Sequence, residues 1–130
     1  MKLGYVIAYV PDVRRAVDFY EQAFGFARRF VDETGSYAEL VSGETTLSFA
    51  SESMAHSNGV NIVPTRIKDA APAIELALVT EQLHADFERA CRAGAVPIQA
   101  PAAKPWGQSV AYVRDLNGVL VELCTPVQKP

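Results

Sequence analysis

Aromatic residues are the side chains in this sequence best suited to hold a flat small molecule. Tyr5, Ile7 and Tyr9 recur at every second position, so a strand there places all three on one face. Trp106, the single tryptophan, stands between a proline and a glycine, where it can cap a planar ligand by stacking. The aromatic residues that we expect to contact a ligand are Tyr5, Tyr9, Tyr37, Phe49, Trp106 and Tyr112.

Residues that commonly bind metals or act as nucleophiles are few and scattered. Of the two histidines, His84 is expected on a solvated helix face. His56 lies in a polar segment, where it is either a surface residue or a weak ligand candidate over a pocket. Cys91 and Cys124 lack the C-x-x-C spacing, and we expect free buried thiols in a reducing, cytoplasmic setting.

Composition excludes several classes of function. The net charge of −3 does not indicate the excess of basic residues that binding to nucleic acid or to an anionic membrane surface requires. No apolar stretch approaches the ~18 residues of a membrane span. Met1–Gly4 leads at once into an apolar run, which predicts a chain without a signal peptide. We therefore expect a protein with no nucleic-acid or membrane partner.

A repeat organises the chain. Residues 5–25 and 74–94 each contain an apolar run, an acidic residue, a helical stretch and a glycine. At a constant offset of 69 the matching pairs are Ala8 and Ala77, Val10 and Val79, Asp12 and Glu81, Ala16 and Ala85, and Gly25 and Gly94.

The elements expected in each copy follow from periodicity and from turn residues. Pro11 ends the first strand, Asp12 is a plausible helix N-cap, and Gly25 ends the helix. In the second copy Gly94 ends the helix and Asn117-Gly118 forms a hairpin turn. The expected strands are 3–10, 27–33, 37–42, 45–50, 73–79, 95–99, 108–114 and 119–124, with helices over 13–24 and 81–93.

This order predicts an α+β fold. Two βαβββ units would form an eight-stranded curved sheet around a central cleft, with the helices on the outer faces. The alternative is two independent domains, but about 60 residues with one helix would have a marginal core. We therefore expect a single domain over 1–130, with a first unit over about 1–51 and a second over about 73–126. The polar linker, 52–72, is either a lid over the pocket or disordered.

The sequence resembles the vicinal oxygen chelate superfamily, which includes glyoxalase I, bleomycin-resistance proteins and extradiol dioxygenases. The resemblance covers essentially the whole chain, and its most specific part is the pattern Y-V-R-D-x-x-G-x-x-x-E-L-x-x-P near the end. The stretches that carry it are Tyr9–Val13, Ala16–Tyr20, Phe24–Phe26, Pro105–Gln108, Ala111–Asp115, Asn117-Gly118, Glu122-Leu123 and Thr125-Pro126. The members of this superfamily differ in function, so the fold does not fix the activity.

The resemblance implies a divalent metal (Zn, Ni, Mn or Fe) held by His, Glu or Gln from the first and last strands of each unit. The corresponding positions here are Tyr5, Leu47, Ile74 (or Glu75 with a one-residue slip) and Glu122. Tyrosine is a poor ligand because its pKa is about 10, and leucine has no donor atom. Glu122 alone matches clearly, with Glu75 as a second candidate and His56 as a weak third.

Glu75 and Glu122 therefore have several possible roles. They could bind a metal weakly, act as an acid/base pair, or anchor a ligand's amine. They could equally be paired with a nearby arginine or with water.

The incomplete ligand set beside the aromatic residues favours a binding protein. It would sequester an aromatic or amphipathic ligand, an antibiotic among them, without a cofactor. The alternative is a divalent-metal-dependent lyase, isomerase or dioxygenase with Glu122 as its catalytic candidate. An acid/base enzyme that uses Glu122 without metal ranks below both. Because the superfamily tends to dimerise, we also expect a homodimer, for which domain swapping is one route.

Overall fold

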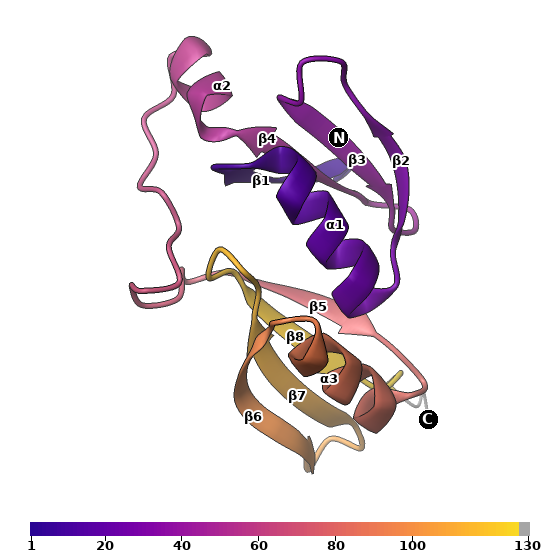
Figure 1. The fold of residues 1–130 in the computed structure, drawn as a ribbon. Coiled ribbons are helices and arrows are strands. Elements are labelled where there is room, and N and C mark those ends of the chain that lie inside the picture. The colour runs from indigo at the N-terminus through magenta and orange to yellow at the C-terminus, as the bar shows by residue number, and fades with distance from the viewer. Residues whose placement is uncertain (128–130) are drawn as a thin grey trace. The chain divides into compact units, whose positions relative to one another are not determined.

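The chain consists of two βαβββ units (Figure 1). The computed structural model describes residues 1–127. It divides into unit 1, Met1–Pro64, and unit 2, which begins at Thr65. Its eight strands form two four-stranded sheets, so the α+β class and the two βαβββ units are confirmed.

Unit 1 has the sheet order β1-β4-β3-β2. Strand β1 pairs in parallel with β4, whereas β3 pairs antiparallel with both β4 and β2. The elements are β1 (Tyr5–Val10), α1 (Val13–Phe24), β2 (Ala27–Val31), β3 (Tyr37–Val41), β4 (Thr46–Ser51) and a short helix α2 (Glu52–Ser57).

Helix α1 has the boundaries that the sequence predicts. The side chain of Asp12 accepts a hydrogen bond from the Arg15 backbone N–H at 3.0 Å and caps the first turn. Gly25 ends the helix with a left-handed φ of 75°. The apolar face of α1 packs on the sheet, where the Tyr20 and Phe49 rings lie 4.9 Å apart and both residues are fully buried.

Unit 2 repeats this topology with the order β5-β8-β7-β6. Strand β5 pairs in parallel with β8, and the remaining pairs are antiparallel. Helix α3 packs against β6, β7 and β8. The elements are β5 (Glu75–Val79), α3 (Leu83–Arg92), β6 (Val96–Ala103), β7 (Ser109–Arg114) and β8 (Leu120–Cys124).

The β7–β8 turn depends on one buried carboxylate. Asp115 is fully buried, and its Oδ1 accepts the backbone N–H groups of Asn117, Gly118 and Val119 at 2.8–2.9 Å. Gly118 has φ +104°, and a Cβ there would lie 2.9 Å from the Arg66 backbone carbonyl. The Asn-Gly signal in the sequence therefore marks a turn that needs glycine for both conformation and space.

The structure departs from the predicted elements in two places. Helix α2 lies at the start of the predicted linker, 52–72, and is capped by the Ser51 hydroxyl. Strand β6 continues to Ala103, past the predicted end near 99, and passes through Pro97 and Pro101. Proline is tolerated there because β6 is an edge strand whose pairing with β7 shifts register twice.

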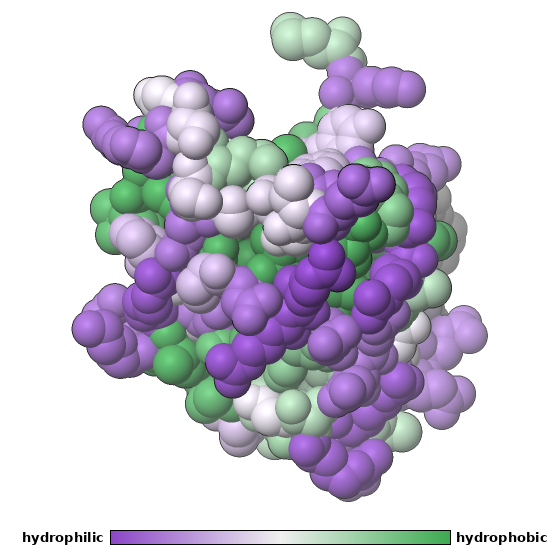
Figure 2. Space-filling model, turned by 45° about the horizontal axis from the view of Figure 1, so that its top comes forward, coloured by the Kyte–Doolittle hydropathy of each residue, from purple (hydrophilic) through white to green (hydrophobic). Residues whose placement is uncertain are grey.

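The surface agrees with the ordinary composition. Figure 2 shows hydrophilic and hydrophobic residues interspersed over the face in view. No helix within residues 1–127 is long and apolar enough to cross a membrane.

Candidate functional site

In each unit one face of the sheet carries the long helix, and we call the other the helix-free face. In unit 1 the residues on this face alternate along β1 and β4 with those that meet α1. The side chains on the unit 1 face include Tyr5, Ile7, Tyr9, Phe30, Tyr37, Glu39, Thr46 and Ser48. Those on the unit 2 face include Glu75, Ala77, Val79, Tyr112 and Glu122.

Glu75 and Glu122 interact on the helix-free face of unit 2. The Tyr112 hydroxyl donates to Glu122 Oε1 at 2.8 Å, and this bond, with burial second, raises the pKa of Tyr112 to about 12. Partial burial, followed by the charge of Glu122, raises the pKa of Glu75. Cys124 is also close, since burial and then Glu122 raise the pKa of its thiol. No ion pair to either glutamate is found in the described part of the chain.

The strand pairing corrects the repeat alignment by one residue. Ala8 pairs with Phe49 and faces α1, whereas Ala77 pairs with Glu122 on the helix-free face. A one-residue slip moves a side chain to the opposite face, so Ala8 and Ala77 are not equivalent. The first strands match at an offset of 70, and Tyr5 corresponds to Glu75 rather than to Ile74.

The same strand pairing also changes which residue of unit 1 corresponds to Glu122. Ile7 pairs with Ser48 in unit 1, as Ala77 pairs with Glu122 in unit 2. The counterpart of Glu122 is therefore Ser48, and the prediction that it is Leu47 was wrong. Leu47 is buried on the face that meets α1.

A polar network lies on the helix-free face of unit 1. The Tyr37 hydroxyl lies 2.8 Å from Glu39 Oε2 and 3.0 Å from Ser48 Oγ. Arg29 Nη1 donates to Glu39 Oε1 at 3.1 Å and to Thr46 Oγ1 at 3.3 Å. Because a phenol has one proton and a carboxylate only accepts, Tyr37 donates to Glu39 and accepts from Ser48. Burial is the main cause that raises the pKa of Tyr37.

A β-bulge places two residues on the helix-free face of unit 1 that the sequence analysis did not identify. Arg28 pairs with Leu40, and Phe30 pairs with Glu39, so Arg29 is an extra residue in β2. Arg29 and Phe30 consequently both reach the helix-free face, where the Phe30 and Tyr37 rings lie 5.9 Å apart. Simple alternation would place one of them on the opposite face.

The predicted aromatic residues divide into surface and core positions. Tyr5 is 55% exposed and Trp106 is 60% exposed, whereas Tyr9, Tyr37 and Tyr112 are half-buried. Phe49 is fully buried against Tyr20 on the side that meets α1. We therefore place Phe49 in the core of unit 1 and not in the candidate site.

Trp106 is exposed and also held in place. Its Nε1 donates to Gln108 Oε1 at 2.7 Å, and Gln108 Nε2 donates to the Thr125 carbonyl at 2.9 Å. Gly107, with φ +86°, closes a tight turn by donating its N–H to the Lys104 carbonyl at 3.1 Å. An exposed indole fixed in this way is a preorganised surface for stacking.

The residues present form only part of the ligand set that the resemblance implies for a metal. With the corrected register, unit 1 offers the hydroxyls of Tyr5 and Ser48, and unit 2 offers the carboxylates of Glu75 and Glu122. His56 is an exposed residue of α2 in unit 1. Among residues 1–127 no group of three or more His, Cys, Asp or Glu side chains could hold a metal ion. Catalytic zinc sites typically use three protein ligands.

The βαβββ topology is duplicated, and each unit leaves one face of its sheet without a long helix. This architecture is the one that the family assignment must explain. The chain belongs to the Glyoxalase/Bleomycin resistance protein/Dioxygenase superfamily, whose family model matches residues 2–123. A comparison with curated proteins gives no match.

Solved structures agree with this assignment. A glyoxalase-related enzyme from Fulvimarina pelagi is similar at 19% identity and a TM-score of 0.82, over 97% of this chain and 88% of that one. TioX from Micromonospora sp. ML1 has 25% identity and a TM-score of 0.69, over 96% and 98%. A glyoxalase/bleomycin resistance protein/dioxygenase family enzyme from Burkholderia phytofirmans PsJN has 19% identity and a TM-score of 0.74, over 98% and 100%.

Proposed function

We propose that this chain is a small-molecule-binding protein of the glyoxalase/bleomycin-resistance type that holds an aromatic or amphipathic ligand without transforming it. The observation that carries the proposal is the donor set at the four family positions, which offers two hydroxyls and two carboxylates and no imidazole. Sequestration of an antibiotic is one role that such a protein can have.

Two separate features of unit 2 support the binding of a planar ligand and of a ligand that carries an amine. They lie at opposite ends of the sheet, because Trp106 precedes Ser109 at the start of β7, whereas Glu75 pairs with Leu120 and so lies level with Arg114 at the end of β7. The indole of Trp106 is exposed and fixed by Gln108, so it can stack on a flat ring without losing further freedom. Glu75 is exposed and has no cationic partner among the described residues. A protonated amine would relieve its repulsion from Glu122.

The single tryptophan gives a direct test of this proposal. Titration with proflavine, a planar cation, should quench Trp106 fluorescence saturably, whereas the planar anion anthracene-9-carboxylate should bind more weakly. Because Glu75 lies at the other end of the sheet, its role is read from the absorbance of the dye itself. Glu75→Gln should weaken this proflavine binding about two- to fivefold, since an exposed ion pair contributes up to ~1 kcal/mol, and should leave the quenching of Trp106 unchanged. Gln108→Leu should weaken binding and lower the fluorescence anisotropy of Trp106 by freeing the indole.

Lys68→Gln is the control for a change of charge at an exposed position of unit 2. Quenching that is linear in dye concentration, or equal affinity for the two dyes in wild type and Glu75→Gln, would count against the proposal.

The interaction between Glu75 and Glu122 favours a second candidate, a divalent-metal-dependent lyase, isomerase or dioxygenase. Elemental analysis of protein purified without chelator separates the two candidates. The binding proposal expects well below one metal per chain and no change in Trp106 fluorescence on adding EDTA. One bound metal per chain that is lost in Glu122→Gln would support the enzyme.

We also propose a homodimer, which remains an expectation from the superfamily. Size-exclusion chromatography with light scattering should give twice the mass of one chain, and the mass of a single chain would reject it.

A further inference from the structure

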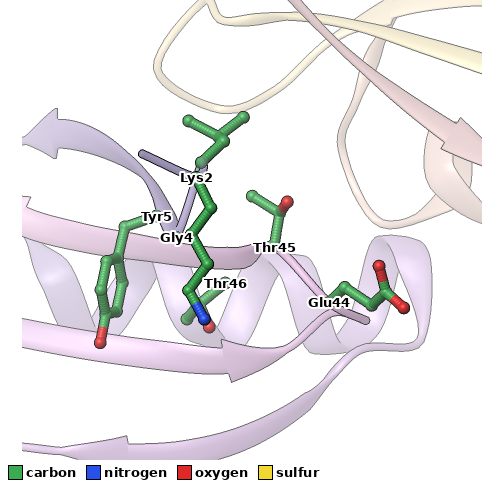
Figure 3. A pocket seen from close by; sticks show the side chains of 7 residues that line it. Lys2, Gly4, Tyr5, Glu44, Thr45 and Thr46 are labelled. Carbon is green, nitrogen blue, oxygen red and sulfur yellow. The ribbon is translucent and has the colours of Figure 1, made fainter.

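A cavity of about 590 Å³ opens in unit 1 where the segment before β1 meets the turn into β4 (Figure 3). Its volume lies within the range of ~300–1,000 Å³ that is typical of small-molecule sites. The residues around it include Lys2, Gly4, Tyr5, Glu44, Thr45 and Thr46. All of them belong to unit 1.

Thr46 gives the cavity a hydrogen-bond donor. The residue is only 8% exposed, and its Oγ1 accepts a hydrogen bond from Arg29 Nη1 at 3.3 Å. Because the guanidinium only donates, the hydroxyl proton of Thr46 is directed elsewhere. No acceptor for that proton is found among residues 1–127, so an acceptor bound in the cavity can take it.

Lys2 adds a positive charge at the same end of the cavity. Its side chain reaches toward Thr46, whereas the Glu44 carboxylate points away from both residues (Figure 3). No hydrogen bond or ion pair of the Lys2 ammonium is found within the described residues. The Lys2 and Thr46 donors therefore face an unfilled space, with the exposed Tyr5 ring beside it.

The charges around the cavity select the kind of ligand. The Arg29 guanidinium that contacts Thr46 is paired with Glu39, so Lys2 is the cation available to a ligand. Its ammonium and the Thr46 hydroxyl suit a group with a single negative charge and two acceptor oxygens. Glu44 at the rim opposes a more highly charged anion. The Tyr5 ring offers an apolar surface to the remainder of the ligand.

We propose that this cavity binds a small aromatic carboxylate that is held through its carboxylate by Lys2 and Thr46 and through its ring by Tyr5. The site shares Tyr5 with the four family positions and goes beyond the proposed function, because Lys2 and Thr46 lie outside those positions and take a ligand of opposite charge.

The test uses benzoate with its neutral analogue benzamide, followed by ¹H–¹⁵N NMR of the full chain. Benzoate should shift the amide signals of Gly4, Thr45 and Thr46 saturably, and benzamide should bind at least tenfold more weakly. Lys2→Gln should weaken benzoate binding about two- to fivefold. Thr46→Val keeps the side-chain shape and should weaken it about tenfold, since a hydrogen bond to a charged group is lost.

Lys68→Gln is the matched control and should bind benzoate as the wild type does. Lys2 is an exposed residue outside the strands, so its replacement keeps the test valid even if Thr46→Val fails to fold. Equal binding of benzoate and benzamide, or wild-type affinity in Lys2→Gln, overturns the proposal. Because the readout is at Gly4–Thr46 and not at Trp106, this result is separable from the proflavine titration.

Discussion

Replacing Asp115 with alanine should lower the free energy of unfolding by about 3 kcal/mol, the largest effect that we expect from a single polar group. The carboxylate is fully buried and accepts three backbone N–H groups of the β7–β8 turn. Alanine would leave these donors without their acceptor. Urea denaturation followed by circular dichroism measures the change.

Asp115→Asn is the control for this prediction. It keeps an acceptor oxygen for the three N–H groups, although it removes the charge and replaces the second oxygen with an NH2 group, so it should cost clearly less than alanine. If the two variants are equally stable, the turn does not depend on these hydrogen bonds.

Phe49→Ala should destabilise the chain by about 3–5 kcal/mol, the usual cost of removing a buried phenylalanine ring. Phe49 is fully buried, and its ring lies 4.9 Å from that of Tyr20. Thermal unfolding followed by circular dichroism would measure the loss.

The milder Phe49→Leu variant distinguishes a core role from a ligand role. It should remain folded and bind proflavine and benzoate with wild-type affinity, because Phe49 faces α1 and not the helix-free face. If well-folded Phe49→Leu binds either probe more weakly than the wild type does, Phe49 contacts the ligand and belongs to the candidate site.

The sequence predicts the larger elements well because their signals are local. Helix α1 begins after Asp12 and ends at Gly25, where a polar cap and a left-handed glycine are physically required. The sequence does not predict helix α2, because its six residues are too few to show the 3.6-residue spacing of apolar side chains that marks a helix.

The candidate site is less predictable because it depends on which face each side chain takes. The offset of 69 matches residue types and still places Ala8 and Ala77 on opposite faces. The sequence leaves Ile74 and Glu75 as alternatives at this position, and strand pairing decides for Glu75, on the same face as Glu122. The sequence does not reveal the bulge at Arg29 for a similar reason. A bulge is defined by how β2 pairs with β3 and not by the residues of β2 alone.

The parallel pairing in each unit also bears on how the chain folds as it is synthesised. The sheet partner of β1 is β4, and that of β5 is β8, so each first strand has no partner until the last strand of its unit is made. Contacts so distant in sequence form late and slowly, after α1 and the β2–β3 hairpin can already exist. We expect β1 to join the edge of the unit 1 sheet, beside β4, while most of unit 2 is still to be synthesised.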